Sequence, residues 1–217
     1  MPLREGLIVF GCLVVAILLH EISHGVAALY FGDDTAKRAG RLTLNPVPHI
    51  DVFGSIILPA MGVLAGLPVF GYAKPVPVNP NRMRNPRRDI VYVSLAGPAS
   101  NLVLMAVAAV ATRWLLNAGN DVPRALDQRG PDLLVDILFW FAVVNLLLGL
   151  FNLLPIPPLD GSAVLERFLP AEWLGTWHRF RPYGLVVVFL VVFMVPGLIT
   201  SIVTPFYDAL VDFVVQR

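Results

Sequence analysis

Residues 5–30 have the sequence EGLIVFGCLVVAILLHEISHGVAALY, an apolar run that carries His20, Glu21 and His24 near its end. A helix of about twenty apolar residues crosses a hydrocarbon core roughly 30 Å thick. Because no small-residue cleavage pattern interrupts the run, we do not interpret it as a removable signal peptide. The stretch therefore predicts a retained membrane-spanning helix.

The composition also indicates a membrane protein. Of 217 residues, 57% are hydrophobic and 14% are charged, whereas soluble domains average about 45–50% and about 25%. Further apolar segments cover residues 52–73, 90–116, 133–154 and 183–204, and an amphipathic stretch that suits the membrane interface follows Pro205. We predict an all-α polytopic membrane protein of about five apolar segments. A single domain is expected over residues 1–217, with a catalytic core at about 5–168 and C-terminal helices at about 183–217.

The second apolar segment differs from the others because glycines and prolines interrupt it, at Pro59, Gly62, Gly66, Pro68 and Gly71. Broken backbone at membrane depth is tolerated only where it is buried in protein or lines a wet cavity. We expect residues 52–73 to enter and leave by one face as a re-entrant hairpin. Before this segment, residues 41–45 (RLTLN) alternate polar and apolar side chains, which predicts a short membrane-associated strand after the first helix.

The first apolar segment carries the side chains that could perform catalysis. His20 and His24 are four residues apart, so both imidazoles project from one helix face and can bind the same zinc ion. Glu21 adjoins the first histidine, where a carboxylate can accept a proton from the attacking water instead of binding metal. Composition alone would produce this pattern roughly once in a thousand such chains. Ionisable residues within an apolar helix are costly, so the cluster predicts a functional site.

A hydrolytic zinc ion needs a third protein ligand and one open coordination position. Residues 152–161 (NLLPIPPLDG) end the fourth apolar segment in a proline-rich turn that contains Asp160. Taken alone, Asp160 could equally be an ordinary helix cap. Beside a two-histidine site that lacks a third ligand, the metal-binding interpretation is favoured. We predict one Zn²⁺ per chain, bound by His20, His24 and Asp160.

Three motifs together resemble the site-2 protease family: HEISHG at residues 20–25, AGPASN at 96–101 and NLLPIPPLDG at 152–161. Members of this family are intramembrane zinc metalloproteases that cut transmembrane helices. The resemblance covers residues from about 7 to 168 and implies the same three ligands, with Glu21 as general base. It also implies that Asn152 helps to hold substrate or to stabilise the oxyanion. The chain is similar to the compact members without a PDZ or CBS domain, although residues 52–73 depart from their simplest three-helix core.

The expected activity is hydrolysis of peptide bonds within or near transmembrane segments of membrane-protein substrates. Such a helical substrate must unwind locally, and the predicted strand at residues 42–44 could hold it by edge addition. The expected partners are these substrates and the lipid bilayer, without nucleic acid. A membrane zinc transporter and a non-proteolytic scaffold are the rival classes. Glu21 argues against transport, because a transport site does not need a non-ligating carboxylate beside its first histidine.

Charge placement predicts the orientation. With a re-entrant second segment, one membrane face receives 11 of the 16 Lys and Arg residues: Lys37, Arg38, Arg41, Lys74, Arg82, Arg84, Arg87, Arg88, Arg167, Arg179 and Arg181. Basic residues gather on the cytoplasmic side of membrane proteins. We therefore expect a multi-pass protein of the cell membrane with the zinc nearer the cytoplasmic face.

Two further residues have alternative interpretations at this stage. Asn145 could line the active cavity together with Asn152, or it could form a hydrogen bond between helices. His49 could be a plain interfacial loop residue, or it could have a gating or supporting role at the site.

Overall fold

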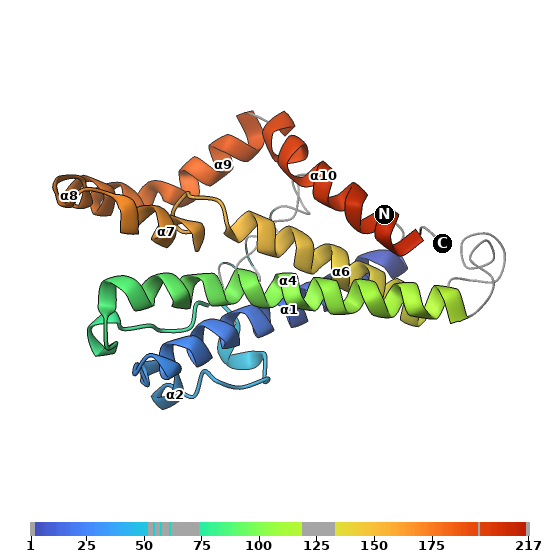
Figure 1. Ribbon diagram of the computed structural model, residues 1–217, viewed down its shortest axis with the longest axis horizontal. Helices are drawn as coiled ribbons and strands as arrows, with labels where there is room; N and C mark the ends of the chain where they lie inside the picture. The colour runs from blue at the N-terminus through green and yellow to red at the C-terminus, as the bar shows by residue number, and fades with distance from the viewer. Residues whose placement is uncertain are drawn as a thin grey trace. The chain divides into compact units, whose positions relative to one another are not determined.

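A computed structural model describes residues 3–51, 74–118, 133–194 and 196–215, with the single positions 54, 57 and 61. Its main helices (Figure 1) are α1 (Leu3–Tyr30), α4 (Pro86–Ala118), α6 (Leu133–Asn152), α7 (Gly161–Phe168), α8 (Ala171–Phe180), α9 (Gly184–Met194) and α10 (Pro196–Val215). Short turns of helix are α2 (Thr35–Arg38), η1 (Val47–His49), η3 (Pro80–Arg82) and η4 (Arg181–Tyr183). The chain divides into two compact units, residues 1–16 with 98–217, and residues 17–97. The single domain expected from the sequence stays a prediction.

Four of the described helices are long and apolar enough to cross a membrane. They cover Leu3–Tyr30, Pro86–Asn117, Leu133–Asn152 and Gly197–Val215. The all-α membrane architecture is therefore confirmed, whereas the number of five apolar segments is not. The predicted re-entrant hairpin at residues 52–73 lies, apart from three positions, outside the described residues.

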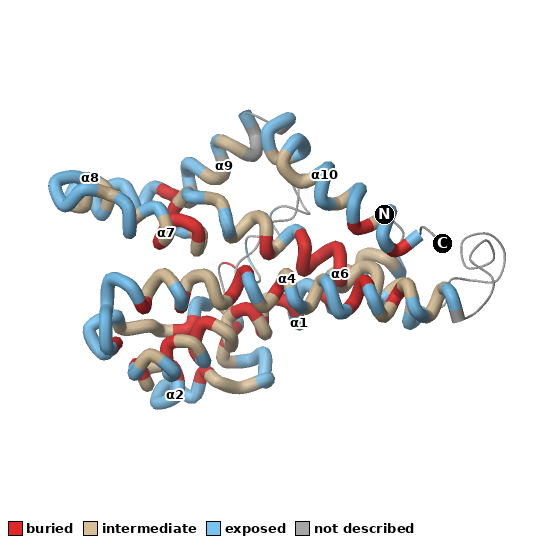
Figure 2. Tube along the Cα trace, in the orientation of Figure 1, coloured by how far each residue is buried: buried red, intermediate tan, exposed pale blue. Residues whose placement is uncertain are grey.

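The first unit is organised around α6, whose middle carries the continuous buried stretch seen in Figure 2. Arg4 near the start of α1 forms an ion pair with Asp136 near the start of α6, at 3.0 Å. Further along both helices, Ala16 and Val144 belong to one buried cluster. The N-terminal half of α1 therefore runs parallel to α6. On another side, Leu210 of α10 packs into the apolar cluster that α4 and α6 share.

In the second unit, the C-terminal half of α1 runs antiparallel to the start of α4. The His24 ring contacts the backbone of Val93, and Phe31 accepts a backbone hydrogen bond from Arg84 at 3.1 Å. Residues 31–85 therefore begin and end on the same face of any bilayer that α1 and α4 both cross. This arrangement agrees with a chain that makes no single net crossing of the membrane between these two helices.

The predicted strand at residues 42–44 is not confirmed, because this stretch consists of bends. Its polar side chains bond to nearby backbone instead. The backbone N–H of Asn45 donates to the Thr43 hydroxyl at 3.1 Å, and the backbone N–H of Val47 donates to the Asn45 side-chain oxygen at 3.0 Å. Such local bonds offer the backbone an alternative to pairing in a sheet.

The C-terminal boundaries also differ from the prediction. The structure describes α9 up to Met194 and α10 from Pro196, and Pro205 lies inside α10. The α9 helix has 11 residues, too few to cross a bilayer alone. The last candidate span is therefore 197–215, and the stretch after Pro205 is not a separate interfacial helix.

Candidate metal centre

His20 and His24 lie one turn apart on the face of α1 that is turned away from solvent. Their side chains are 6% and 9% exposed, and their Nε2 atoms lie 3.0 Å apart. Two nitrogens that share one zinc ion, each at 2.0–2.1 Å, are at most about 4 Å apart. The pair therefore presents two imidazole nitrogens at a spacing that one ion can bridge.

A backbone carbonyl orients the second histidine. The Nδ1 atom of His24 lies 2.7 Å from the oxygen of Val93. Because a carbonyl oxygen only accepts hydrogen bonds, Nδ1 must carry the proton, and Nε2 of the neutral ring then holds a lone pair. Metal-binding histidines are characteristically oriented in this way through the ring nitrogen that does not bind the metal. This contact is the strongest structural evidence that His24 is prepared to bind a cation through Nε2.

Gly97 of α4 lets the backbone approach both imidazoles. A Cβ atom added at this position would lie 2.6 Å from Cε1 of His20 and closer still to Nε2 of His24. Such distances are not tolerated between non-bonded atoms, so any larger residue would displace the rings. The glycine in AGPASN thus shapes the space in which the two histidines meet.

Glu21 is held by the loop that precedes α4. One of its carboxylate oxygens, Oε2, accepts a hydrogen bond from the backbone N–H of Val76 at 2.7 Å. This bond engages one oxygen, so the other oxygen keeps its capacity to accept a hydrogen bond. The side chain therefore remains a carboxylate with acceptor capacity beside the first histidine.

Asp160 and Asn152 flank the proline-rich turn of the first unit. Asp160 stands at the N-cap position of α7, yet its side chain makes no capping hydrogen bond, which weakens the helix-cap alternative. Asn152 ends α6 and donates its amide to the Leu148 carbonyl at 2.9 Å within its own helix. Both residues are half-buried.

Asn145 and His49 can now be placed. Asn145 is fully buried and accepts a hydrogen bond from Asn101 of α4, so the alternative of a helix-to-helix bond is the one observed. His49 is 4% exposed at the end of η1, and a supporting role at the site stays a prediction. Sequence reasoning did not find Val76 and Val93, because their contribution is a backbone atom that no side-chain pattern reveals.

Comparisons with known proteins identify the family of the chain. The family model described as "Peptidase family M50" matches residues 128–195. The chain is 41% identical over 184 residues to "Putative zinc metalloprotease YwhC" of Bacillus subtilis, which covers 85% of this chain and 78% of that protein. The chain belongs to the M50, or site-2 protease, family. The resemblance seen in its motifs is therefore confirmed.

Two further relatives of this site-2 protease come from Mycobacterium tuberculosis. "Putative zinc metalloprotease Rip2" is 35% identical over 85% of this chain and 66% of its own length. "Putative zinc metalloprotease Rip3" is 29% identical over 72% of this chain and 30% of its own length. No solved structure matches. The chain is thus an integral membrane zinc metalloprotease.

Proposed function

We propose that this site-2 protease hydrolyses peptide bonds within or near transmembrane segments of other membrane proteins. The observation that carries the proposal is the Val93 carbonyl bond to His24, because it prepares a metal-binding nitrogen inside a helix long enough to span a bilayer. His20 lies 17 residues after the first residue of α1, a rise of roughly 25 Å. A bond cleaved at this depth must itself come from within the membrane.

The ligand set in this proposal is His20, His24 and Asp160, each of which would offer one ligand atom to a single Zn²⁺. Two imidazole nitrogens with one carboxylate oxygen form a donor set found in hydrolytic zinc enzymes, which keep a further position open. When bound, the zinc ion would supply Lewis acidity that makes water easier to deprotonate and a carbonyl easier to attack.

Glu21 would act as the general base. The Val76 N–H holds one carboxylate oxygen at 2.7 Å, so the second oxygen can accept a proton from the attacking water. The same carboxyl group can then return that proton to the departing amine. Asn152, at the C-terminal end of α6, would donate its amide to the substrate carbonyl and exchange its present bond to Leu148 for that contact.

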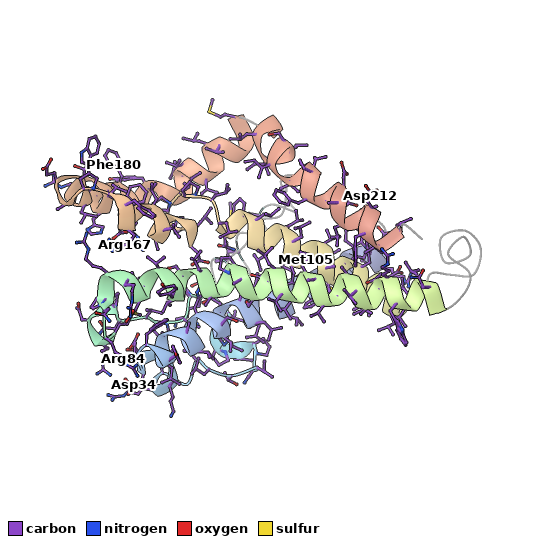
Figure 3. All side chains as sticks on the ribbon, viewed as in Figure 1. Asp34, Arg84, Met105, Arg167, Phe180 and Asp212 are labelled. Atoms are coloured by element: carbon purple, nitrogen blue, oxygen red, sulfur yellow. The ribbon has the colours of Figure 1, made fainter. Side chains whose placement is uncertain are left out.

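The orientation in the membrane follows from charge. Seven exposed basic residues of the second unit lie in the sequence between the end of α1 and the first turn of α4: Lys37, Arg38, Lys74, Arg82, Arg84, Arg87 and Arg88. Figure 3 labels Arg84 and Asp34 at this end of the unit. Because basic residues favour the cytoplasmic face, we propose that this end lies on the cytoplasmic side of a cell membrane. His24 lies nearer to this end of α1 than to Leu3, so the metal centre would be nearer the cytoplasm.

A proteoliposome experiment tests the proposal. Purified full-length chain would be mixed with a single-pass model substrate, and the cleaved bond would be located by mass spectrometry. We expect cleavage within or next to the transmembrane segment and none with Glu21→Gln, while that variant keeps about one zinc per chain. Wild-type rates for Glu21→Gln, or cleavage confined to soluble regions far from the membrane, would contradict it. Zinc uptake into substrate-free vesicles would instead support the transporter alternative.

A further inference from the structure

His49 is a buried titratable residue that the proposed mechanism does not use. It is 4% exposed, and neither ring nitrogen makes a hydrogen bond of ordinary geometry with any residue that the structure describes. A buried polar group without such a bond costs about 1–3 kcal/mol relative to one that has it. An imidazole retained at this cost suggests a role other than packing.

The loop that precedes α4 links His49 to Glu21. The backbone N–H of Lys74 donates to the His49 carbonyl at 2.9 Å. Two residues later, the backbone N–H of Val76 donates to the Glu21 carboxylate at 2.7 Å. Residues two apart in a chain are separated by at most about 7 Å between Cα atoms. One short segment therefore anchors both the backbone of His49 and the side chain of the general base.

Charged groups on either side set the state of the ring. Burial lowers the pKa of His49, and the Arg41 guanidinium lowers it further, whereas a loose hydrogen bond to the Thr43 backbone and the Glu21 charge act in the opposite direction without reversing the shift. Arg41 is itself buried and donates to the carbonyl oxygens of Lys74 and Pro75, at 2.5 and 3.3 Å. At neutral pH the ring is therefore uncharged, with one N–H donor and one acceptor nitrogen.

We propose that His49 is a positioning residue of the proteolytic site, whose ring N–H hydrogen-bonds the Glu21 carboxylate during turnover, directly or through one water. The inference rests on the proposed function, because it acts through Glu21 as base. Val76 and His49 would then hold the carboxylate from two sides and aim its remaining lone pairs at the attacking water. A neutral donor achieves this without adding a second positive charge beside the metal.

Replacement by leucine separates positioning from packing. Replacing a buried imidazole that makes no hydrogen bond of ordinary geometry with the described residues by an apolar side chain of similar size should leave stability unchanged or raise it. The proposal expects His49→Leu to fold with a melting temperature at or above that of the wild type and with unchanged zinc content. Its kcat should fall about 10- to 100-fold, with little change in KM. This is the range typical of residues that orient the groups of a metal site through hydrogen bonds.

A second test asks whether an amide side chain at position 49 restores the lost kcat. Asn places an N–H near the position of Nδ1, and Gln places one near Nε2, so at least one of His49→Asn and His49→Gln should recover most of the lost kcat. His178→Leu is the matched control. His178 is a histidine of α8 that is 54% exposed and paired with Glu166, and its replacement should leave kcat unchanged.

Each outcome decides the proposal. Wild-type kcat in His49→Leu would overturn it, as would a His49→Leu chain that does not fold, because folding would then depend on the polar atoms of the ring. Equal loss in the leucine and both amide variants would show that no hydrogen bond is involved. If Glu21→Gln also cleaved substrate at the wild-type rate, the proposed function itself would fail. A dead Glu21→Gln beside a fully active His49→Leu would refute only the role of His49.

Discussion

The side-chain amide of Asn101 donates to the Oδ1 atom of Asn145 at 2.8 Å and joins α4 to α6 within one unit. Both residues are fully buried. Asn145 in turn donates to the Phe141 carbonyl of its own helix at 2.8 Å. Two polar side chains thus satisfy each other inside an apolar helix pair, where an unsatisfied amide would be costly.

We predict that the hydrogen bond between Asn101 and Asn145 stabilises the fold. In a double-mutant cycle with Asn101→Ala and Asn145→Ala, the coupling energy should be about 0.6–1.7 kcal/mol, the range found for hydrogen bonds between membrane helices. Reversible unfolding in mixed detergent micelles would measure it. Thr112→Val is a suitable control partner, because its hydroxyl bonds within α4 to Ala108, and its effect should add to that of Asn145→Ala. A coupling energy near zero for the asparagine pair would contradict the prediction.

Side-chain patterns in the sequence predicted much of this architecture but little of what orients the site. Apolar runs predicted α1, α4 and α6 closely, because burial in lipid depends on side-chain hydrophobicity alone. The division into α9 and α10 was not predicted, since the apolar run continues from one helix into the other. The contacts of Val76 and Val93 could not be predicted, because each uses a backbone atom that every residue type provides. The strand expected near Thr43 is absent, because local side-chain bonds outweigh its alternating pattern.

Gly97→Ala should weaken zinc binding. The added methyl group would meet Cε1 of His20 at 2.6 Å and press on His24, so the two Nε2 atoms could no longer converge. A loss of about 10- to 100-fold in zinc affinity is expected, measured by competition with a chromogenic chelator. Gly11→Ala in α1 is the matched control, since a Cβ there meets nothing within 4 Å. Unchanged affinity in Gly97→Ala would show that the rings are free to move aside.

Asp160→Ala should lose most of the bound zinc and all proteolytic activity while the helices remain folded. The reason is that helix packing in the first unit rests on apolar clusters and on the asparagine pair rather than on Asp160. Asp136→Ala is the control, because Asp136 forms a partly exposed ion pair with Arg4 and such pairs contribute at most about 1 kcal/mol. Zinc content and circular dichroism would be measured together. Full zinc occupancy in Asp160→Ala would remove it from the ligand set.

Asp33 should make the loop structure of the second unit sensitive to acid. Burial alone would raise the pKa of its carboxyl, but hydrogen bonds from Thr35 and from the Asn79 backbone, with the charge of Arg82, outweigh it and lower the pKa. A lowered folded-state pKa stabilises the fold above the unfolded pKa, about 4, and this contribution is lost as the pH falls through the folded value. Asp33→Asn should therefore melt below the wild type at pH 7, and the difference should persist down to about pH 4 and shrink only below it. A difference that does not depend on pH would contradict this.

The last prediction concerns topology. Because α1 runs antiparallel to the start of α4, Lys37 and Arg84 should lie on one membrane face, and Gln128, between α4 and α6 in the sequence, on the other. Single cysteines at these positions, in a Cys12→Ala background, would be labelled with an impermeant maleimide on intact cells and on inverted vesicles. The positive-inside tendency places positions 37 and 84 in the cytoplasm, so they should react only in inverted vesicles, and position 128 only on intact cells. Labelling of 37 and 84 from opposite faces would mean that residues 52–73 cross the membrane once, which the antiparallel pairing of α1 and α4 does not allow.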